Sequence, residues 1–318
     1  MKVYSIIVTY NGMQRSWIQK CFDSLLSSSV ATEIIAIDNG STDGSIEFIQ
    51  KNYPQIKLIV ANENLGFAKA NNVGIKYALE QGADYFFLLN QDAWVEKDTI
   101  EKLIKAFEQM PDAGIVSPIH LNGSKTNLDC GFANYMVNNN TPNFISDLYF
   151  NRPQQFYETQ FVNAAAWLLS RKCIEKVGGF DTSVFYHYGE DDNYCQRVIY
   201  HGFKIYIATT TAICHDREER VGKRPVEHEK CRVEVGKRTY YGNILNNDKI
   251  LDDAILVSKR TFSIQFSMKR IIKLQFKKLN TQRKIAQEDL NLYFKIKQSR
   301  KKNKQGGLVW LNDDCDDK

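Results

Sequence analysis

The sequence lacks several patterns that would place the protein in a familiar class. Its seven cysteines are scattered and form no C-x-x-C pair, which argues against a zinc site or a disulfide framework and indicates a reducing, cytoplasmic environment. No run approaches the roughly 18 consecutive apolar residues that a membrane-spanning helix needs. No G-x-G-x-x-G follows the first predicted strand and no P-loop sequence occurs. Dinucleotide-binding and P-loop proteins are therefore poor matches.

Charge is distributed unevenly along the chain. Residues 258–304 contain 15 Lys and Arg against only Glu288 and Asp289, a net +13, which leaves −8 for the rest of a chain whose total is +5. A nucleic-acid-binding protein is expected to carry basic residues around its binding groove, whereas here they lie away from every motif described below. We therefore expect no nucleic-acid partner. With 318 residues, 43% of them hydrophobic and 12% aromatic, the chain suffices for one large domain and an appendage, or for two domains.

Apolar runs alternate with segments of helical periodicity in the first part of the chain. Strands are predicted at residues 4–10, 33–38, 56–61, 85–92 and 114–118, and helices at residues 17–27, 45–52, 66–81 and 99–108. This alternation implies right-handed β-α-β crossovers. The expected fold class is α/β, with a Rossmann-like, mainly parallel central sheet flanked by helices.

Asp92 stands at the carboxyl end of the most apolar of these predicted strands. Ligands of open α/β sheets bind at the carboxyl ends of the strands, and a carboxylate in that position can coordinate a divalent cation. The alternatives are that Asp92 caps a helix beginning at Ala93 or that it is a turn residue. The turns after Val8, Ile37 and Leu89 should meet at the same sheet edge, which is the usual geometry of a nucleotide or phosphate site.

The alternating pattern stops at about residue 123. Residues 123–159 are rich in Asn, Thr and aromatic residues, and we expect them to form a long loop over the sheet. Regular structure then resumes, with helices predicted at residues 171–177 and 190–201 and a strand at residues 204–208.

Seven short motifs follow one another in order. They are Val8-Thr9-Tyr10-Asn11, the run from Ile37 to Gly44, the run from Asn64 to Asn72, Leu89-Asn90-Gln91-Asp92, Gly178-Gly179-Phe180-Asp181, Glu190-Asp191 and His215. Together they resemble the family 2 glycosyltransferases, which have the GT-A fold, over residues 3–217. Within that family the chain is most similar to bacterial rhamnosyltransferase-like enzymes of cell-surface polysaccharide biosynthesis.

The resemblance implies an inverting glycosyltransferase. Such an enzyme would move a sugar from a UDP- or dTDP-sugar donor, rhamnose being a candidate, to a saccharide or lipid-linked saccharide acceptor. Two other classes are weighed against it: a nucleotidyltransferase that makes the sugar nucleotide, and a non-catalytic saccharide-binding relative. The first should have a basic, glycine-rich loop after its first strand, which Thr9 to Gly12 does not provide.

The donor nucleotide is expected at the first turns and at the segment after residue 63. Asp38 can accept hydrogen bonds from the base or the ribose, or can form an Asx turn at Asn39-Gly40. Gly66 allows the backbone to approach closely, although residues 64–72 can equally be an ordinary loop and first helical turn. The predicted donor-binding residues are Thr9, Tyr10, Asn11, Asp38, Asn64, Gly66, Lys69 and Gln91.

The resemblance assigns the metal ligands to Asp92 and His215, with Mn²⁺ or Mg²⁺ as the cofactor. The family pattern is Asp-x-Asp, but this chain has Asn90 at the first position. The site should therefore rely on His215 and on the donor diphosphate. The alternative for His215 is a hydrogen-bonded histidine at a strand end.

The resemblance assigns the catalytic base to Asp191, with Glu190 beside it. Adjacent acids raise one another's pKa, which suits a base that works near neutral pH. They also suit a helix N-terminus, where the dipole favours negative charge. Trp167 and Tyr188 are expected to stack on the acceptor sugar, with core packing as the alternative.

The predicted organisation is a catalytic domain at residues 1–225, a basic, mainly helical region at residues 226–305, and a disordered acidic tail at residues 306–318. Residues 260–279 form a basic amphipathic pattern. We expect residues 258–304 to contact the anionic inner face of the plasma membrane. The alternatives are packing on the catalytic domain or on a second subunit of a homo-oligomer.

Overall fold

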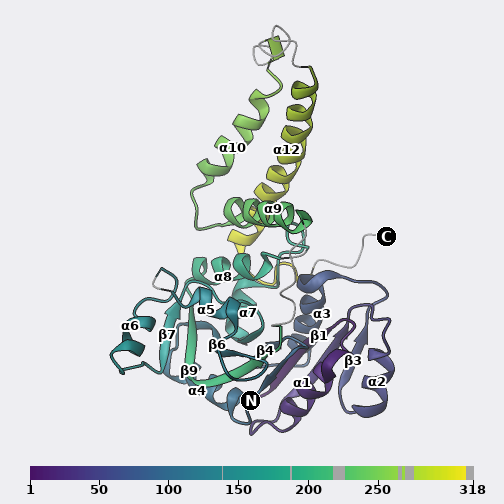
Figure 1. Cartoon of the computed structure of the whole chain (residues 1–318), viewed down its shortest axis with the longest axis vertical. Coiled ribbons are helices and arrows are strands. Elements are labelled where there is room, and N and C mark those ends of the chain that lie inside the picture. Colours follow the sequence, from purple (N-terminus) through teal and green to yellow (C-terminus); the bar gives the residue numbers. More distant parts are fainter. Residues whose placement is uncertain (138, 187, 218–225, 264–266, 269–275, 313–318) are drawn as a thin grey trace.

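The structure is a computed structural model that describes residues 1–137, 139–186, 188–217, 226–263, 267–268 and 276–312. Nine strands within these residues form one sheet, in the order β3-β2-β1-β4-β8-β6-β9-β5, with β7 pairing on β9 (Figure 1). The strands are β1 (Val3–Thr9), β2 (Glu33–Asp38), β3 (Lys57–Val60), β4 (Tyr85–Leu89), β5 (Ala93–Val95), β6 (Ala113–Asn122), β7 (Phe156–Thr159), β8 (Ala166–Ser170) and β9 (Lys204–His215).

Helices cover both faces of this sheet and extend beyond it. Those of the α/β part are α1 (Trp17–Leu26), α2 (Ser45–Asn52), α3 (Gly66–Glu80), α4 (Thr99–Gln109), α5 (Cys130–Tyr135), α6 (Phe144–Tyr149), α7 (Arg171–Val177) and α8 (Glu190–Tyr200). The last described part of the chain contains α9 (Val226–Gly242), α10 (Asp248–Arg260) and α12 (Phe276–Gln305).

The predicted α/β class is confirmed, but the strand directions are only partly as expected. Strands β3, β2, β1 and β4 are parallel, as the alternating pattern predicts. Strand β8 is antiparallel to both β4 and β6, and β5 and β7 are antiparallel to β9. Strand β9 is again parallel to β6, so parallel parts of the sheet lie on both sides of β8. The direction of β8 is not evident from the sequence, because strands buried on both faces have the same apolar composition in either direction.

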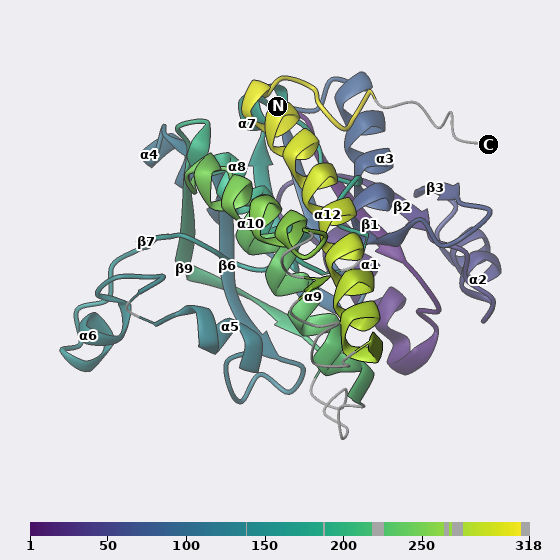
Figure 2. The same ribbon diagram turned by 90° about the horizontal axis from the view of Figure 1, so that it is seen from above.

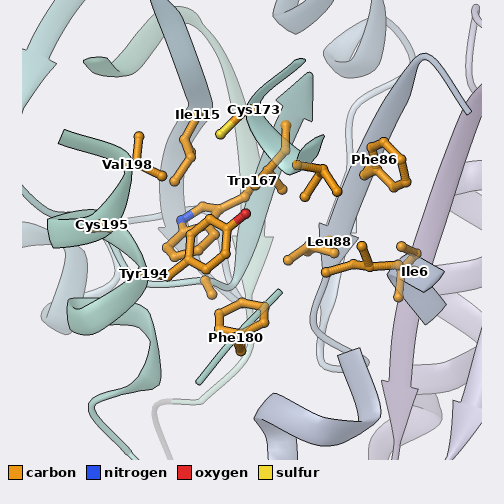
Figure 3. Close-up of a cluster of buried hydrophobic side chains, with 14 of the residues drawn as sticks. Ile6, Phe86, Leu88, Ile115, Trp167, Cys173, Phe180, Tyr194, Cys195 and Val198 are labelled. Carbon is orange, nitrogen blue, oxygen red and sulfur yellow. The ribbon is translucent and has the colours of Figure 1, made fainter. Parts of the chain in front are cut away.

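Two hydrophobic clusters hold the helices on opposite faces of the sheet. One contains buried side chains of α1, α2 and α4, and the other contains those of α3, α7 and α8. Trp167, Phe180 and Tyr194 lie at the centre of the second cluster (Figure 3). The sheet is thus buried on both sides, and only its strand ends are available for a site.

The helix alternative for Asp92 is wrong, because the residues after it form the short strand β5. Ala93 pairs with His215 at the end of β9. Asp92 is therefore a turn residue between two strands, and it lies beside a residue that is far away in the sequence.

The C-terminal helices extend away from the α/β part (Figure 1). Helices α10 and α12 lie side by side, and α9 lies near the ends of these helices that are closer to the α/β part (Figure 1 and Figure 2). A third hydrophobic cluster joins them to Val184 and Phe185 of the α/β part. Half of the predicted amphipathic helix at residues 260–279 lies outside the described residues. None of the helices in the described ranges has the length and hydropathy needed to cross a membrane.

Residues 306–312 do not form the predicted disordered tail. Trp310 and Leu311 are 7% and 3% exposed, and Leu311 belongs to the cluster that also contains α3 and α7. The Val309 carbonyl accepts a hydrogen bond from the Gly179 N–H, and the Trp310 carbonyl accepts one from the Asn72 amide. The two apolar residues were overlooked because the acidic residues after them dominate the composition. Residues 313–318 lie outside the described residues.

Replacing Trp310 tests whether the end of the chain belongs to the core. Trp310→Ala removes a buried aromatic side chain, so we expect the free energy of unfolding to fall by about 3–5 kcal/mol. Tyr149→Ala removes a side chain that is 82% exposed and should change this energy by no more than about 0.5 kcal/mol. Urea unfolding measures both variants. Equal, small effects would show that residues 306–312 do not support the fold.

Candidate active site

The first two turns are joined by hydrogen bonds at the carboxyl edge of the sheet. Thr9 pairs with Asp38 in the β1–β2 register, and its hydroxyl donates to Asp38 Oδ2 at 3.1 Å. The Asn11 N–H donates to the Ser41 hydroxyl, and the Thr42 N–H donates to the Asn11 side-chain oxygen. The predicted meeting of these two turns is confirmed.

Asp38 makes the Asx turn that was the alternative to nucleotide binding. Its Oδ1 accepts from the N–H groups of Gly40 and Ser41 at 3.2 and 2.9 Å, and its Oδ2 accepts from the hydroxyls of Thr9 and Ser41. These four bonds use the four acceptor positions of a carboxylate, and the side chain is fully buried. Binding of a base or ribose by Asp38 stays a prediction, and it would require one of these bonds to be exchanged.

The third turn is fastened to the first by Gln91. Its side-chain oxygen accepts from the Tyr10 N–H and its amide donates to the Tyr10 carbonyl, both at 2.9 Å. This pair of bonds holds the Tyr10 backbone, while the Tyr10 side chain is 45% exposed and free to face a ligand. Donor binding by Tyr10 and Gln91 stays a prediction, with Gln91 placed to support Tyr10.

Asp92 and His215 come together as the sequence predicts. Strand β5 pairs with β9, and Asp92 Oδ1 lies 3.5 Å from His215 Nε2 with both side chains buried. The Asn90 amide nitrogen lies 3.5 Å from the same ring nitrogen. One carboxylate, one imidazole and the Asn90 amide group therefore lie close together, with the amide nitrogen toward the ring.

Asp129 and Arg217 were missed by sequence reasoning, and they complete this corner of the site. Asp129 caps α5 by accepting from the Phe132 N–H, and it is paired with the Arg217 guanidinium through both carboxylate oxygens. Its Oδ2 lies 3.7 Å from His215 Nδ1. Asp129 belongs to the irregular segment at residues 123–159, where no spacing links it to His215.

Arg217 interacts with both Asp129 and the predicted base. Burial alone would raise the pKa of Asp129, but the hydrogen bond from Arg217 lowers it below its usual value. The guanidinium also hydrogen bonds to Tyr135 and acts electrostatically on Asp191. Arg217 thus interacts with Asp129 through hydrogen bonds and with Asp191 through its charge.

The acids of α8 are partly withdrawn from water. Burial, followed by the charge of Asp191, raises the pKa of Glu190 to about 8. Burial and the same charge raise the pKa of Asp192 to about 7. Burial also raises the pKa of Asp191, against the effect of backbone N–H groups and of Arg217. A raised pKa suits a base that works near neutral pH, the role predicted for Asp191.

The segment after residue 63 packs against the loop that precedes α8. The Tyr186 hydroxyl donates to the Asn64 carbonyl at 3.1 Å. Gly66 has φ +78, and a Cβ at this position would lie only 2.7 Å from the Tyr186 carbonyl oxygen. Gly66 is therefore required by the protein itself. Asn64, Lys69 and Tyr186 also line a cavity of about 250 Å³, so donor contacts by Asn64 and Lys69 stay predictions.

The structure contradicts the acceptor role of Trp167. The side chain is fully buried and stacks on Phe180 at 6.1 Å between ring centroids, beside Tyr194 (Figure 3). Core packing, the alternative, is what Trp167 does. Tyr188 is 56% exposed just before α8, and its acceptor role stays a prediction.

The predicted metal ligands fit a cation that is completed by other ligands. Across the described ranges of the chain, no group of three or more His, Cys, Asp or Glu side chains is arranged to hold a metal ion. Asp92 and His215 supply two ligands. Mg²⁺ in particular is commonly held by one or two protein carboxylates together with water and substrate phosphates. The pair therefore suits a metal that binds together with the diphosphate of the donor.

The sheet order and the acid-lined edge of the central strands define the protein as a glycosyltransferase with the GT-A fold. Residues 5–178 match the model of the family described as "Glycosyl transferase family 2". The chain belongs to this family, and the resemblance seen in the sequence is confirmed.

Curated relatives include rhamnosyltransferases. The chain is 24% identical to "dTDP-rhamnosyl transferase RfbF" of Shigella flexneri over 216 residues, which cover 67% of this chain and 68% of RfbF. It is 25% identical to "N-acetylglucosaminyl-diphospho-decaprenol L-rhamnosyltransferase" of Mycobacterium tuberculosis over 228 residues, covering 64% of this chain and 74% of that enzyme.

Two solved structures have a similar fold, and the alignment with one of them extends over nearly the whole chain. S. aureus TarS 1–349 in complex with UDP aligns with a TM-score of 0.50 at 14% identity, covering 95% of this chain and 91% of that one. GalNAc-T7 with UDP, GalNAc and Mn²⁺ aligns with a TM-score of 0.52 at 12% identity, covering 68% of this chain and 44% of that one. At these identities the likeness concerns the fold alone.

The raised pKa of Glu190 predicts a pH-dependent stability. A folded-state pKa of about 8 exceeds the ordinary value, so the contribution of this group to stability is complete below about pH 4 and is lost as the pH rises toward 8. The free energy of unfolding should fall over this window, with a limiting slope of about 1.4 kcal/mol per pH unit for one proton. Glu190→Gln should flatten the curve.

Urea unfolding between about pH 5 and pH 8 measures the effect. Glu80→Gln, at an exposed position of α3, is the matched control and should keep the wild-type slope. A wild-type slope in Glu190→Gln would contradict the assignment.

Proposed function

We propose that the protein is an inverting glycosyltransferase that transfers a sugar from a nucleoside diphosphate donor to a hydroxyl of a saccharide acceptor. The observation that carries the proposal is the placement of the Asp92–His215 pair, the donor turns and Asp191 around one edge of the sheet. The rhamnosyltransferase relatives support a dTDP-linked deoxyhexose, rhamnose first, with a UDP-sugar as the other candidate. The mycobacterial relative, an "N-acetylglucosaminyl-diphospho-decaprenol L-rhamnosyltransferase", supports a lipid-linked saccharide acceptor.

In this proposal the turns at Thr9–Asn11 and Asp38–Ser41 bind the nucleotide, and the exposed side chains of Tyr10, Asn64 and Lys69 contact it. Asp92 and His215 hold Mn²⁺ or Mg²⁺, which when bound neutralises the leaving diphosphate as a Lewis acid. The remaining chemistry belongs to α8.

Asp191 accepts the proton of the acceptor hydroxyl. Its raised pKa makes it a stronger base than an ordinary carboxylate. Glu190, with a pKa of about 8, keeps its proton near neutral pH, so it does not oppose ionisation of Asp191. Arg217 limits the rise in the pKa of Asp191, because a nearby cation favours the ionised form of the carboxyl group.

Two further expectations remain proposals: contact between residues 258–304 and an anionic membrane, and homo-oligomer formation. Phe262, Met268 and Phe276 are 41%, 54% and 52% exposed near the far end of the α10–α12 pair. Exposed apolar side chains among basic residues suit a membrane surface, which would bring the enzyme to a lipid-linked acceptor.

A panel of nucleotide sugars, incubated with Mn²⁺ or Mg²⁺ and read by release of nucleoside diphosphate, tests the class of reaction and the donor. Asp191→Asn should bind the productive donor with unchanged affinity and transfer on the order of 10²–10⁴-fold more slowly, because it lacks the base. Wild-type turnover in this variant would exclude Asp191 as the base. In a separate assay, release of pyrophosphate from a nucleoside triphosphate and a sugar 1-phosphate would favour the nucleotidyltransferase. Donor binding without turnover would favour the non-catalytic relative.

Removing Asp92 tests the metal. Asp92→Ala should lose the dependence of turnover on Mn²⁺ and slow transfer on the order of 10²-fold or more, since metal stabilisation of the leaving group is worth several kcal/mol. Titration calorimetry of Mn²⁺ in the presence of UDP or dTDP should show weaker binding. Asp252→Ala, an exposed change on α10, is the control and should behave as wild type. Unchanged metal affinity in Asp92→Ala would contradict the assignment.

A further inference from the structure

The loop that leads into α8 is held mainly by the C-terminal helices. We propose that α12 positions the catalytic base, with Ser299 and Asn303 as positioning residues that act through Asp181. The proposal rests on the proposed function, because it takes Asp191 as the base. The loop is defined here as residues 182–186 and 188–189, and is called the base loop.

Asp181 joins the start of the base loop to α12. Its fully buried carboxylate uses Oδ1 to accept from the N–H and the hydroxyl of Ser183, at 2.9 and 2.7 Å, and from the Val184 N–H. Its Oδ2 accepts from the Ser299 hydroxyl and from the Asn303 amide. Oδ1 is therefore bonded to the base loop and Oδ2 to α12. A buried carboxylate that loses its hydrogen-bond donors destabilises the folded protein.

The donors on α12 are themselves fixed. The Asn303 amide also donates to the Ser299 hydroxyl at 3.0 Å, and the Asn303 side-chain oxygen accepts from the Trp310 indole N–H at 2.7 Å. Ser299 and Asn303 are 2% and 0% exposed. The packed C-terminal residues therefore fix the positions of the two side chains that donate to Asp181.

Hydrophobic packing supports the same loop further along. Phe185 is fully buried in the third cluster, against side chains of α10 and α12 that include Leu251 and Ile296. At the end of the loop a Cβ on Gly189 would lie 2.8 Å from Thr239 Cγ2 of α9. The C-terminal helices therefore contact the base loop at its beginning, middle and end.

The backbone just before the base is in an uncommon conformation. Tyr188 has φ 65 and Gly189 has φ 88, both in the left-handed region. For a tyrosine this region is unfavourable and persists only when the surroundings impose it. Because these residues directly precede Glu190 and Asp191, loosening the joint at Asp181 should let the backbone relax and move the base.

The C-terminal helices can act as one support because Arg300 ties them together. Its guanidinium donates to the carbonyls of Tyr241 and Asn246, at 3.1 and 2.7 Å, and pairs with Asp248. Arg300 is only 3% exposed and lies next to Ser299 on α12. The link between α9 and α10 is thereby attached to the same turn of α12 that holds Asp181.

Full-length Ser299→Ala tests the proposal. We expect kcat to fall roughly ten- to hundredfold, because a displacement of about 1 Å at a catalytic group costs that much. The affinity for UDP or dTDP with Mn²⁺ should stay within about twofold, because the nucleotide turns do not contact α12. Ser299→Thr keeps the hydroxyl and should recover most of the rate. Ser258→Ala, a mostly buried serine on α10, is the matched control and should have wild-type kinetics.

Hydrogen exchange supplies a readout that does not need turnover. In Ser299→Ala the amides of the base loop should exchange faster, while those of β1 and α1 should not change. Unchanged exchange in the base loop, or a loss of rate that Ser299→Thr shares, would overturn the proposal. If the wild type transfers no sugar from any donor, the proposed function fails, and the exchange data alone still decide whether α12 holds the base loop.

Discussion

The site depends on the pairing of β5 with β9. This short antiparallel contact places His215 opposite Ala93, and so beside Asp92. A shift of one residue in this register would turn His215 to the other face of the sheet, away from Asp92. The parallel register of β1 and β2 likewise places the turns that follow these two strands next to each other, because it aligns Thr9 with Asp38. Strand register, which is set by buried apolar residues, therefore fixes the relative positions of the polar side chains in the site.

Charge in the site is balanced within the protein before any ligand arrives. Arg217 is held by Asp129, so its cation is already engaged and does not attract a diphosphate freely. Asp92 and Asp191 add carboxyl groups to the same region, while Glu190 keeps its proton near neutral pH. An ionised carboxylate repels a diphosphate, and a bound divalent cation would offset that repulsion. In the proposed function, Asp92 and His215 would be the two protein ligands of a metal that binds together with its substrate.

Much of the fold could be predicted from the sequence, because the apolar runs and helical periodicities of the first 120 or so residues are strong. The direction of β8 could not, since its composition is the same in a parallel or antiparallel position. The ordered motifs predict Asp92, His215 and Asp191 as site residues, and the structure brings Asp92 and His215 together. Asp129 was not, because only the folded path of the irregular segment brings it to His215. Trp167 was misread because an aromatic residue near a site is as well suited to the core as to a sugar.

The burial of Leu311 has a consequence for how the protein folds. The cluster that contains this residue also contains Ile6 of β1, so one hydrophobic core includes side chains from both ends of the described chain. Because synthesis on the ribosome proceeds from the N-terminus, the sheet can form while the chain is still growing, but this core cannot be closed until residue 311 has left the ribosome. The enzyme therefore acquires its complete catalytic domain only after its C-terminal helices have been made, and active protein without these helices should not accumulate during synthesis.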